Sequence, residues 1–134
     1  MSSDGKLSIT GTLSISAATQ TAEQTSYTVA AGSTYALVDL SGAGRLHEVT
    51  VISPSPSFKL TITVDGTVIW DKSYSDAEAE TDEVVMVSAF QREDGKYVYH
   101  LSDIPYTSNL KVEVTNTGTS NITFDLLFAK WEVT

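Results

Sequence analysis

Few side chains in this sequence are grouped in a way that could carry out chemistry. His47 and His100 are the only histidines, and neither has a second histidine nearby at the spacing of metal ligands. Serine is frequent, but there is no G-x-S-x-G elbow, no P-loop and no G-x-G-x-x-G fingerprint. A pair of glycosidase carboxylates forms only in space, so the sequence does not test for one. We expect a protein that is not an enzyme, with no catalytic residues, cofactor or metal.

An acidic run at residues 76–83, from Asp76 to Glu83, is the strongest candidate for a cation site. Carboxylate oxygens are ligands that Ca²⁺ prefers. The run lacks the D-x-D-x-D-G spacing of a calcium loop, however. A solvated loop with one helical turn is the simpler interpretation, and calcium binding stays an open alternative.

Trp70 is the aromatic side chain best placed by the sequence to stack on a sugar. It lies in "KLTITVDGTVIWDKSY", where Asp65-Gly66 predicts a two-residue type I′ hairpin turn. Regular pairing from that turn puts Trp70 opposite Thr61 and beside Thr63, on the polar side of the hairpin. These three residues are the candidate contacts with a glycan or a partner. The alternative for Trp70 is packing between two sheets.

The elements that must position these residues are strands. Apolar and polar residues alternate with a period of two, and threonine, valine, isoleucine and tyrosine are enriched, whereas helical periodicity is nearly absent. We expect strands at about 6–15, 25–30, 34–40, 45–52, 58–64, 67–74, 84–90, 96–101, 110–116 and 122–133. Many short strands with turn signals between them predict an antiparallel β-sandwich or a closed barrel.

The last of these segments contains two overlapping apolar sets. Ile122, Phe124, Leu126 and Phe128 form one set, which alternates with Thr123 and Asp125, and then Leu127, Ala129, Trp131 and Val133 form the apolar set. A bulge near Ala129 or Lys130, or a strand that passes from one neighbour to another, would explain the change of phase.

Composition limits the classes of partner. A chain of 134 residues suits one domain, and the absence of cysteine excludes disulfides and thiolate metal sites. The net charge of −9, with only eight scattered basic residues, argues against nucleic acid. No signal peptide is recognised at the N-terminus, and the apolar runs are too short to span a bilayer, so we expect no membrane insertion.

The N-terminal segment differs from the rest of the chain. Residues 1–22 are predicted to be an arm and linker, and residues 23–134 the folded domain. Within "KLSITGTLSIS" one face carries Leu7, Ile9, Leu13 and Ile15, whereas "AATQTAEQTS" has the composition of a linker. A lone strand must pair with an edge of its own domain or of another chain, and both alternatives are open. The four apolar residues are the candidate interface of the arm.

Three short motifs carry a resemblance to a known family. They are the "D-x-S-G-x-G" of Asp39, Ser41, Gly42 and Gly44, the "I-x-V-D-G" of Ile62, Val64, Asp65 and Gly66, and the "L-K-V-E-V-x-N-T-G" that runs from Leu110 through Lys111, Val112, Glu113, Val114, Asn116 and Thr117 to Gly118. Over about residues 25–128 the chain resembles the small jelly-roll proteins of the virions of tailed bacteriophages and related viruses.

The resemblance implies a jelly-roll-like sandwich of eight to nine strands, preceded by a pairing arm. It also implies a virion protein made in the host cytoplasm, a capsid decoration or fibre-tip component that forms a homotrimer and contacts other virion proteins. Two alternatives stay open: a carbohydrate-binding module that uses an aromatic face, and a filament subunit that donates a strand to its neighbour.

Overall fold

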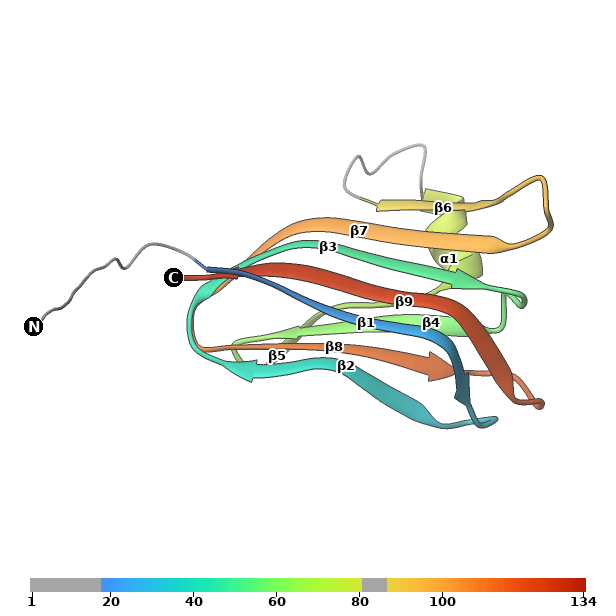
Figure 1. The fold of residues 1–134 in the computed structure, drawn as a ribbon, viewed down its shortest axis with the longest axis horizontal. Helices are drawn as coiled ribbons and strands as arrows, with labels where there is room; N and C mark the ends of the chain where they lie inside the picture. Colours follow the sequence, from blue (N-terminus) through green and yellow to red (C-terminus); the bar gives the residue numbers. More distant parts are fainter. Residues whose placement is uncertain (1–17, 81–86) are drawn as a thin grey trace, which may run out of the picture.

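Two antiparallel sheets stack face to face in the computed structural model, which describes residues 18–80 and 87–134 (Figure 1). One sheet has five strands in the order β1-β9-β3-β7-β6, and the other has four in the order β2-β8-β4-β5. The elements are β1 (Ala18–Val29), β2 (Thr34–Ser41), β3 (Gly44–Ser53), β4 (Phe58–Val64), β5 (Thr67–Ser73), α1 (Tyr74–Glu80), β6 (Val87–Gln91), β7 (Tyr97–Tyr106), β8 (Asn109–Asn116) and β9 (Ile122–Val133). The predicted all-β sandwich of eight to nine strands is confirmed, with nine strands among the described residues.

The pairing of the strands follows the wrapped hairpin of a jelly roll. β1 pairs with β9, β2 with β8, β3 with β7 and β4 with β5, so the two halves of the chain run side by side from the termini to the Asp65-Gly66 turn. Folding this long hairpin over itself makes β1 to β4 alternate between the two sheets, and β7 to β9 alternate in the same way. β6 adds one further strand at the edge of the larger sheet. No helix among the described residues is long and apolar enough to cross a membrane.

The core lies between the sheets and is built from alternate residues of each strand. Phe58 lies at an aromatic centre, with ring centroids 5.9 Å from Tyr74, 5.9 Å from Tyr99 and 5.5 Å from Phe124. Phe58 is fully buried, and full burial of such a side chain contributes about 1.5–3 kcal/mol of hydrophobic free energy. Tyr74 belongs to α1, so this short helix closes one side of the sandwich.

The β4–β5 hairpin has the predicted turn but not the predicted pairing. Asp65 and Gly66 have φ angles of 53° and 83°, as a type I′ turn requires. Thr63 then pairs with Val68, but Ile62 pairs with Trp70, so Ile69 is an extra residue in a bulge. An unbroken hairpin would have set Lys59 opposite Lys72. The bulge sets Lys59 opposite Ser73 instead, with its Nζ 3.1 Å from Asp71 Oδ1.

The segment predicted to be a linker is a strand. β1 begins at Ala18, which pairs with Val133, and its pairing with β9 continues to Val29. The linker prediction for residues 18–22 is therefore wrong, and the sheet includes these five residues. Polar residues suffice here because β1 lies at a sheet edge, where most of its side chains are exposed. The arm residues Leu7, Ile9, Leu13 and Ile15 lie outside the described residues.

The change of phase in β9 comes earlier than predicted. Phe124 and Leu127 both point into the core and are fully buried, so the side chains change face between them and not near Ala129. Ser26 of β1 lies beside this irregularity, with a φ of 50°. As a result Leu126 and Phe128 point away from the core.

Candidate interaction surface

Trp70 does not form the exposed aromatic platform that the sequence predicted. Its Nε1 donates a hydrogen bond of 2.7 Å to the hydroxyl of Tyr99, which belongs to the opposite sheet. The Tyr99 hydroxyl in turn donates to the carbonyl oxygen of Lys72 over 3.0 Å. The bulge at Ile69 is the cause, because it turns Trp70 to the side of Ile62, which is fully buried. Trp70 therefore packs between the sheets, as the alternative interpretation proposed.

The two threonines grouped with Trp70 lie apart from it, on the outer side of the hairpin. Thr61 Oγ1 donates to Asp71 Oδ1 over 3.1 Å, and Thr63 pairs with Val68. Hydrogen bonds from Lys59 and Thr61 hold the pKa of Asp71 below its usual value. The structure therefore brings Thr61 and Thr63 to one face but separates them from the indole.

The two histidines also lie in separate places, each beside a carboxylate. His47 Nε2 is 2.9 Å from Glu132 Oε1. His100 Nδ1 is 3.0 Å from Thr50 Oγ1 and 4.0 Å from Glu48 Oε2. Within residues 18–80 and 87–134, no group of three or more histidines and carboxylates is arranged to hold a metal ion.

Part of the acidic run folds into α1 and has local partners. The hydroxyl of Ser73 accepts a hydrogen bond of 3.1 Å from the main-chain nitrogen of Asp76, which caps the start of the helix. Tyr74 donates to Glu78 Oε2 over 3.0 Å, and burial together with this bond raises the pKa of the Tyr74 hydroxyl. The predicted helical turn is present, whereas residues 81–83 lie outside the described residues.

The outer face of the five-stranded sheet carries a row of apolar side chains that sequence reasoning missed. Leu126 pairs with Ile52, Ile52 pairs with Val98, and Val98 pairs with Phe90. These four residues, here called the apolar row, cross β9, β3, β7 and β6 side by side. Val98 is buried by its neighbours yet lies outside the core cluster, and Phe90 is 46% exposed. The row is thus a second apolar layer on the outer face, and Phe90 is its most exposed member.

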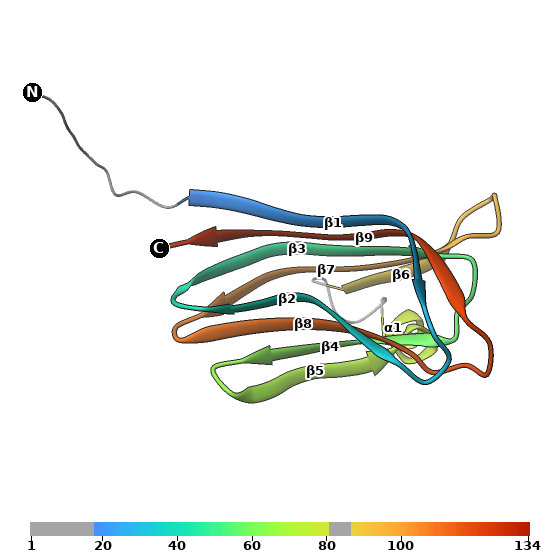
Figure 2. The same cartoon turned by 60° about the horizontal axis from the view of Figure 1, so that its bottom comes forward.

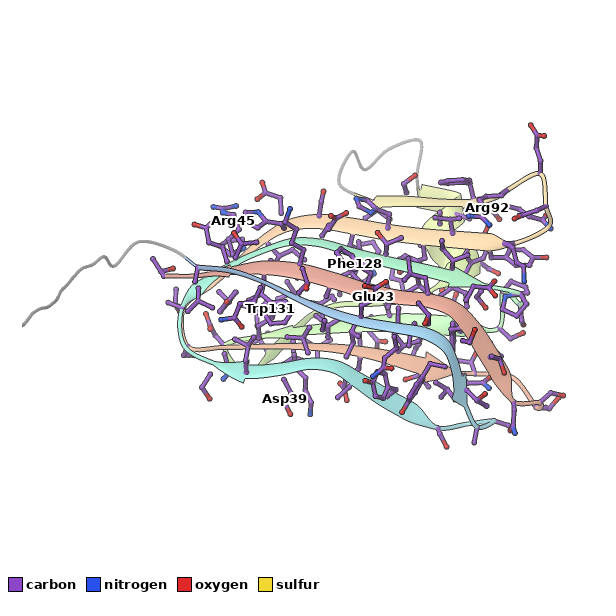
Figure 3. All side chains as sticks on the ribbon, viewed as in Figure 1. Glu23, Asp39, Arg45, Arg92, Phe128 and Trp131 are labelled. Atoms are coloured by element: carbon purple, nitrogen blue, oxygen red, sulfur yellow. The ribbon has the colours of Figure 1, made fainter. Side chains whose placement is uncertain are left out.

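The same face becomes more polar with each step away from the apolar row. The next row contains Phe128 of β9, opposite Glu23 of β1 on one side and Thr50 of β3 on the other (Figure 3). One step further, Lys130 lies opposite Glu48. On the opposite side of the apolar row, Lys96 forms a 2.9 Å ion pair with Asp125. An apolar patch with a polar rim is typical of a protein interaction site.

A shallow pocket at one end of the sandwich is a weaker candidate for a binding site than the apolar row. It has a volume of about 210 Å³ and is lined by Ser55, Ser57, Gly118, Thr119, Ser120, Asn121 and Ile122. The lining contains no aromatic ring and no titratable side chain. A sugar would find hydroxyl and amide groups here but no stacking surface.

Comparison with known proteins does not identify a family for this chain. No protein-family profile and no curated protein matches the chain. Among solved structures, it is similar to part of the dimeric latent PorU from Porphyromonas gingivalis, with 13% identity and a TM-score of 0.46. The match covers 87% of this chain and 13% of the PorU chain. A likeness this distant carries no argument about function.

Proposed function

We propose that this chain is a non-enzymatic structural subunit of a virion, a capsid decoration protein or a fibre or spike component. It acts through contacts between its own copies, as a closed homotrimer, and with other virion proteins. The jelly-roll strand order supports this proposal, since the fold builds many capsid proteins. The same fold also hosts lectins, so the fold alone does not decide the function.

The observation that carries the proposal is the apolar row on the outer face of the larger sheet. These four residues do not belong to the core, which lies on the opposite side of their strands, yet Phe90 is exposed and Ile52 and Leu126 are half-buried. Burial of these side chains against another protein would remove apolar surface from water and favour association. The carbohydrate-binding alternative has less support, because its first candidate residue, Trp70, packs against the core and the described pocket has no aromatic lining.

Native mass measured by light scattering at several concentrations tests the proposal. Phe90→Asp places a charge in the apolar row, and Val68→Asp is a matched control, because Val68 is 54% exposed on β5 of the other sheet. We expect a trimer whose dissociation constant rises at least about tenfold in Phe90→Asp and stays unchanged in Val68→Asp. Equal masses for both variants and the unaltered chain would remove the apolar row from the mechanism.

The arm is tested separately by deleting residues 1–17, which leaves β1 complete. Loss of the trimer on deletion assigns the arm to assembly, and an unchanged trimer excludes it. The virion assignment itself is tested by mass spectrometry of purified virus particles from the source that encodes the chain. Absence of the chain from such particles would contradict it.

A further inference from the structure

The outer edge of β1 is open. On one side β1 pairs with β9 from Ala18 to Val29, and no described strand lies on its other side (Figures 1 and 2). From Ala18 to Thr25 the pairing is regular, and Ser26, with its positive φ, ends the regular part. An edge of this kind presents unpaired main-chain N–H and C=O groups that can bind another strand.

The other three edges of the sandwich carry features that oppose strand addition. β5 is bulged at Ile69, and β2 is bulged between Ala36 and Val38. The described part of β6 covers five residues. Bulges and short strands are the usual means by which proteins protect sheet edges. β1 has none of them within residues 18–25, where Glu23 is the one charged residue and proline is absent.

The charge of the chain indicates where two copies can approach. With 17 acidic and 8 basic residues, copies of this chain repel one another over most of their surface. The regular part of β1 holds a single charge, and its side chains are otherwise small or neutral. An antiparallel strand is also its own complement about a two-fold axis perpendicular to the sheet.

We propose that β1 pairs antiparallel with β1 of a second copy, so that the two five-stranded sheets form one continuous sheet. An axis through Ala22 sets Glu23 opposite Thr21 of the second copy, so the two carboxylates do not face each other. Main-chain groups of alternate residues supply about eight hydrogen bonds across the axis. This contact goes beyond the proposed trimer, because a two-fold contact cannot join neighbouring subunits of a closed three-fold ring; it joins one copy to a copy of another trimer.

A single cysteine tests the pairing directly, because the chain has none of its own. Residues directly opposite in antiparallel strands have Cβ atoms about 5 Å apart, close to the span of a disulfide. We expect Ala22→Cys to form a disulfide-linked dimer under mild oxidation. Thr67→Cys, exposed on β5, is the control and should stay monomeric on a non-reducing gel.

A charge series at Thr21 tests the register. Thr21→Glu sets a carboxylate opposite Glu23 of the second copy, whereas Thr21→Lys sets an ammonium there. By sedimentation equilibrium, we expect Thr21→Glu to weaken the dimer at least about tenfold and Thr21→Lys to keep or tighten it. Thr67→Glu makes the same charge change on the other sheet and should have no effect. Equal behaviour of the two Thr21 variants would overturn the register centred on Ala22.

The outcomes separate this inference from the proposed function. An assembly that is sensitive to Phe90→Asp but shows no cross-link in the Ala22→Cys variant overturns the β1 contact and leaves the structural role standing. If the β1 cross-link still forms in Phe90→Asp and after deletion of residues 1–17, the β1 contact stands. The role of the apolar row in assembly is then contradicted. A monomer without a cross-link at every concentration contradicts both.

Discussion

Asp65 and Thr107 join two turns that lie far apart in the sequence. The carboxylate of Asp65, in the β4–β5 turn, accepts a 2.6 Å hydrogen bond from the Thr107 hydroxyl and a 3.0 Å bond from the Thr107 main-chain nitrogen, in the turn between β7 and β8. It also accepts bonds from the main-chain nitrogens of Ser108 and Asn109. One exposed side chain thereby satisfies several donors of a turn that lies far away in the sequence.

The first prediction is a loss of stability in acid that depends on Asp65. The hydrogen bond from the Thr107 hydroxyl, followed by the main-chain bonds from Ser108 and Asn109, holds the pKa of Asp65 well below its ordinary value of 3.8. A carboxylate with a lowered folded-state pKa contributes stability above its unfolded-state pKa and loses it as the pH falls. We therefore expect thermal stability to decrease below about pH 4, and Asp65→Asn to have a smaller decrease over the same range.

Thermal melts of both proteins between neutral and acidic pH check this prediction. Asp39→Asn is a suitable control, because Asp39 is also an exposed aspartate and lies on β2. At neutral pH, Asp65→Asn should melt at a lower temperature than Asp39→Asn, since an amide cannot accept all of these bonds as a carboxylate does. Identical acid profiles for Asp65→Asn and the unaltered chain would show that the carboxylate has no such role.

The second prediction concerns Gly44, where β3 passes close to the last strand. A Cβ at Gly44 would overlap the carbonyl oxygen of Glu132 and lie 2.5 Å from the hydroxyl of Tyr106. That hydroxyl donates a 3.0 Å hydrogen bond to the same carbonyl, so neither group can move without losing its partner. We expect Gly44→Ala to lower the free energy of unfolding by about 3 kcal/mol.

Gly32→Ala separates crowding from backbone strain. Gly32 has a φ of 74°, and a Cβ added there would have no atom within 4 Å. Alanine at this position therefore causes backbone strain but no crowding. The expected loss is about 1 kcal/mol. Urea denaturation of the two variants gives both values, and equal losses would contradict the crowding at Gly44.

Local features were predictable from the sequence, and features that depend on distant contacts were not. The Asp65-Gly66 turn follows from the ease with which these residues adopt a positive φ. The bulge at Ile69 has no such local signal, because it is Tyr99 of the opposite sheet that receives the indole of Trp70. Residues 18–24 of β1 were missed for a related reason: these polar residues form a strand only because β9 offers them a partner.

The apolar row was hidden by the assumption that apolar residues belong to the core. The two overlapping apolar sets in residues 122–133 were the available signal, since a strand apolar on both sides must cover something on each. The sequence interpretation explained them by a late bulge instead. With the change of face before Leu127, Leu126 and Phe128 fall on the outer face, beside Ile52 and Thr50.

The last prediction is an energetic coupling between Trp70 and Tyr99. The Tyr99 hydroxyl accepts from Trp70 Nε1 over 2.7 Å and donates to the carbonyl oxygen of Lys72 over 3.0 Å, so it links β5 to β7 across the sandwich. Tyr99→Phe leaves a part-buried indole N–H and a carbonyl without this partner, and we expect a loss of about 1–2 kcal/mol in the free energy of unfolding. Trp70→Phe removes the donor and should lose a similar amount.

The double variant shows whether the hydrogen bond is the cause. If the two side chains act through it, the combined loss falls short of the sum of the single losses by about 1 kcal/mol. Tyr106→Phe combined with Trp70→Phe is the matched control, because Tyr106 donates instead to Glu132. That pair should be additive. Additive losses for Trp70 and Tyr99 would mean that packing alone, and not the hydrogen bond, holds the edge strand β5 to the opposite sheet.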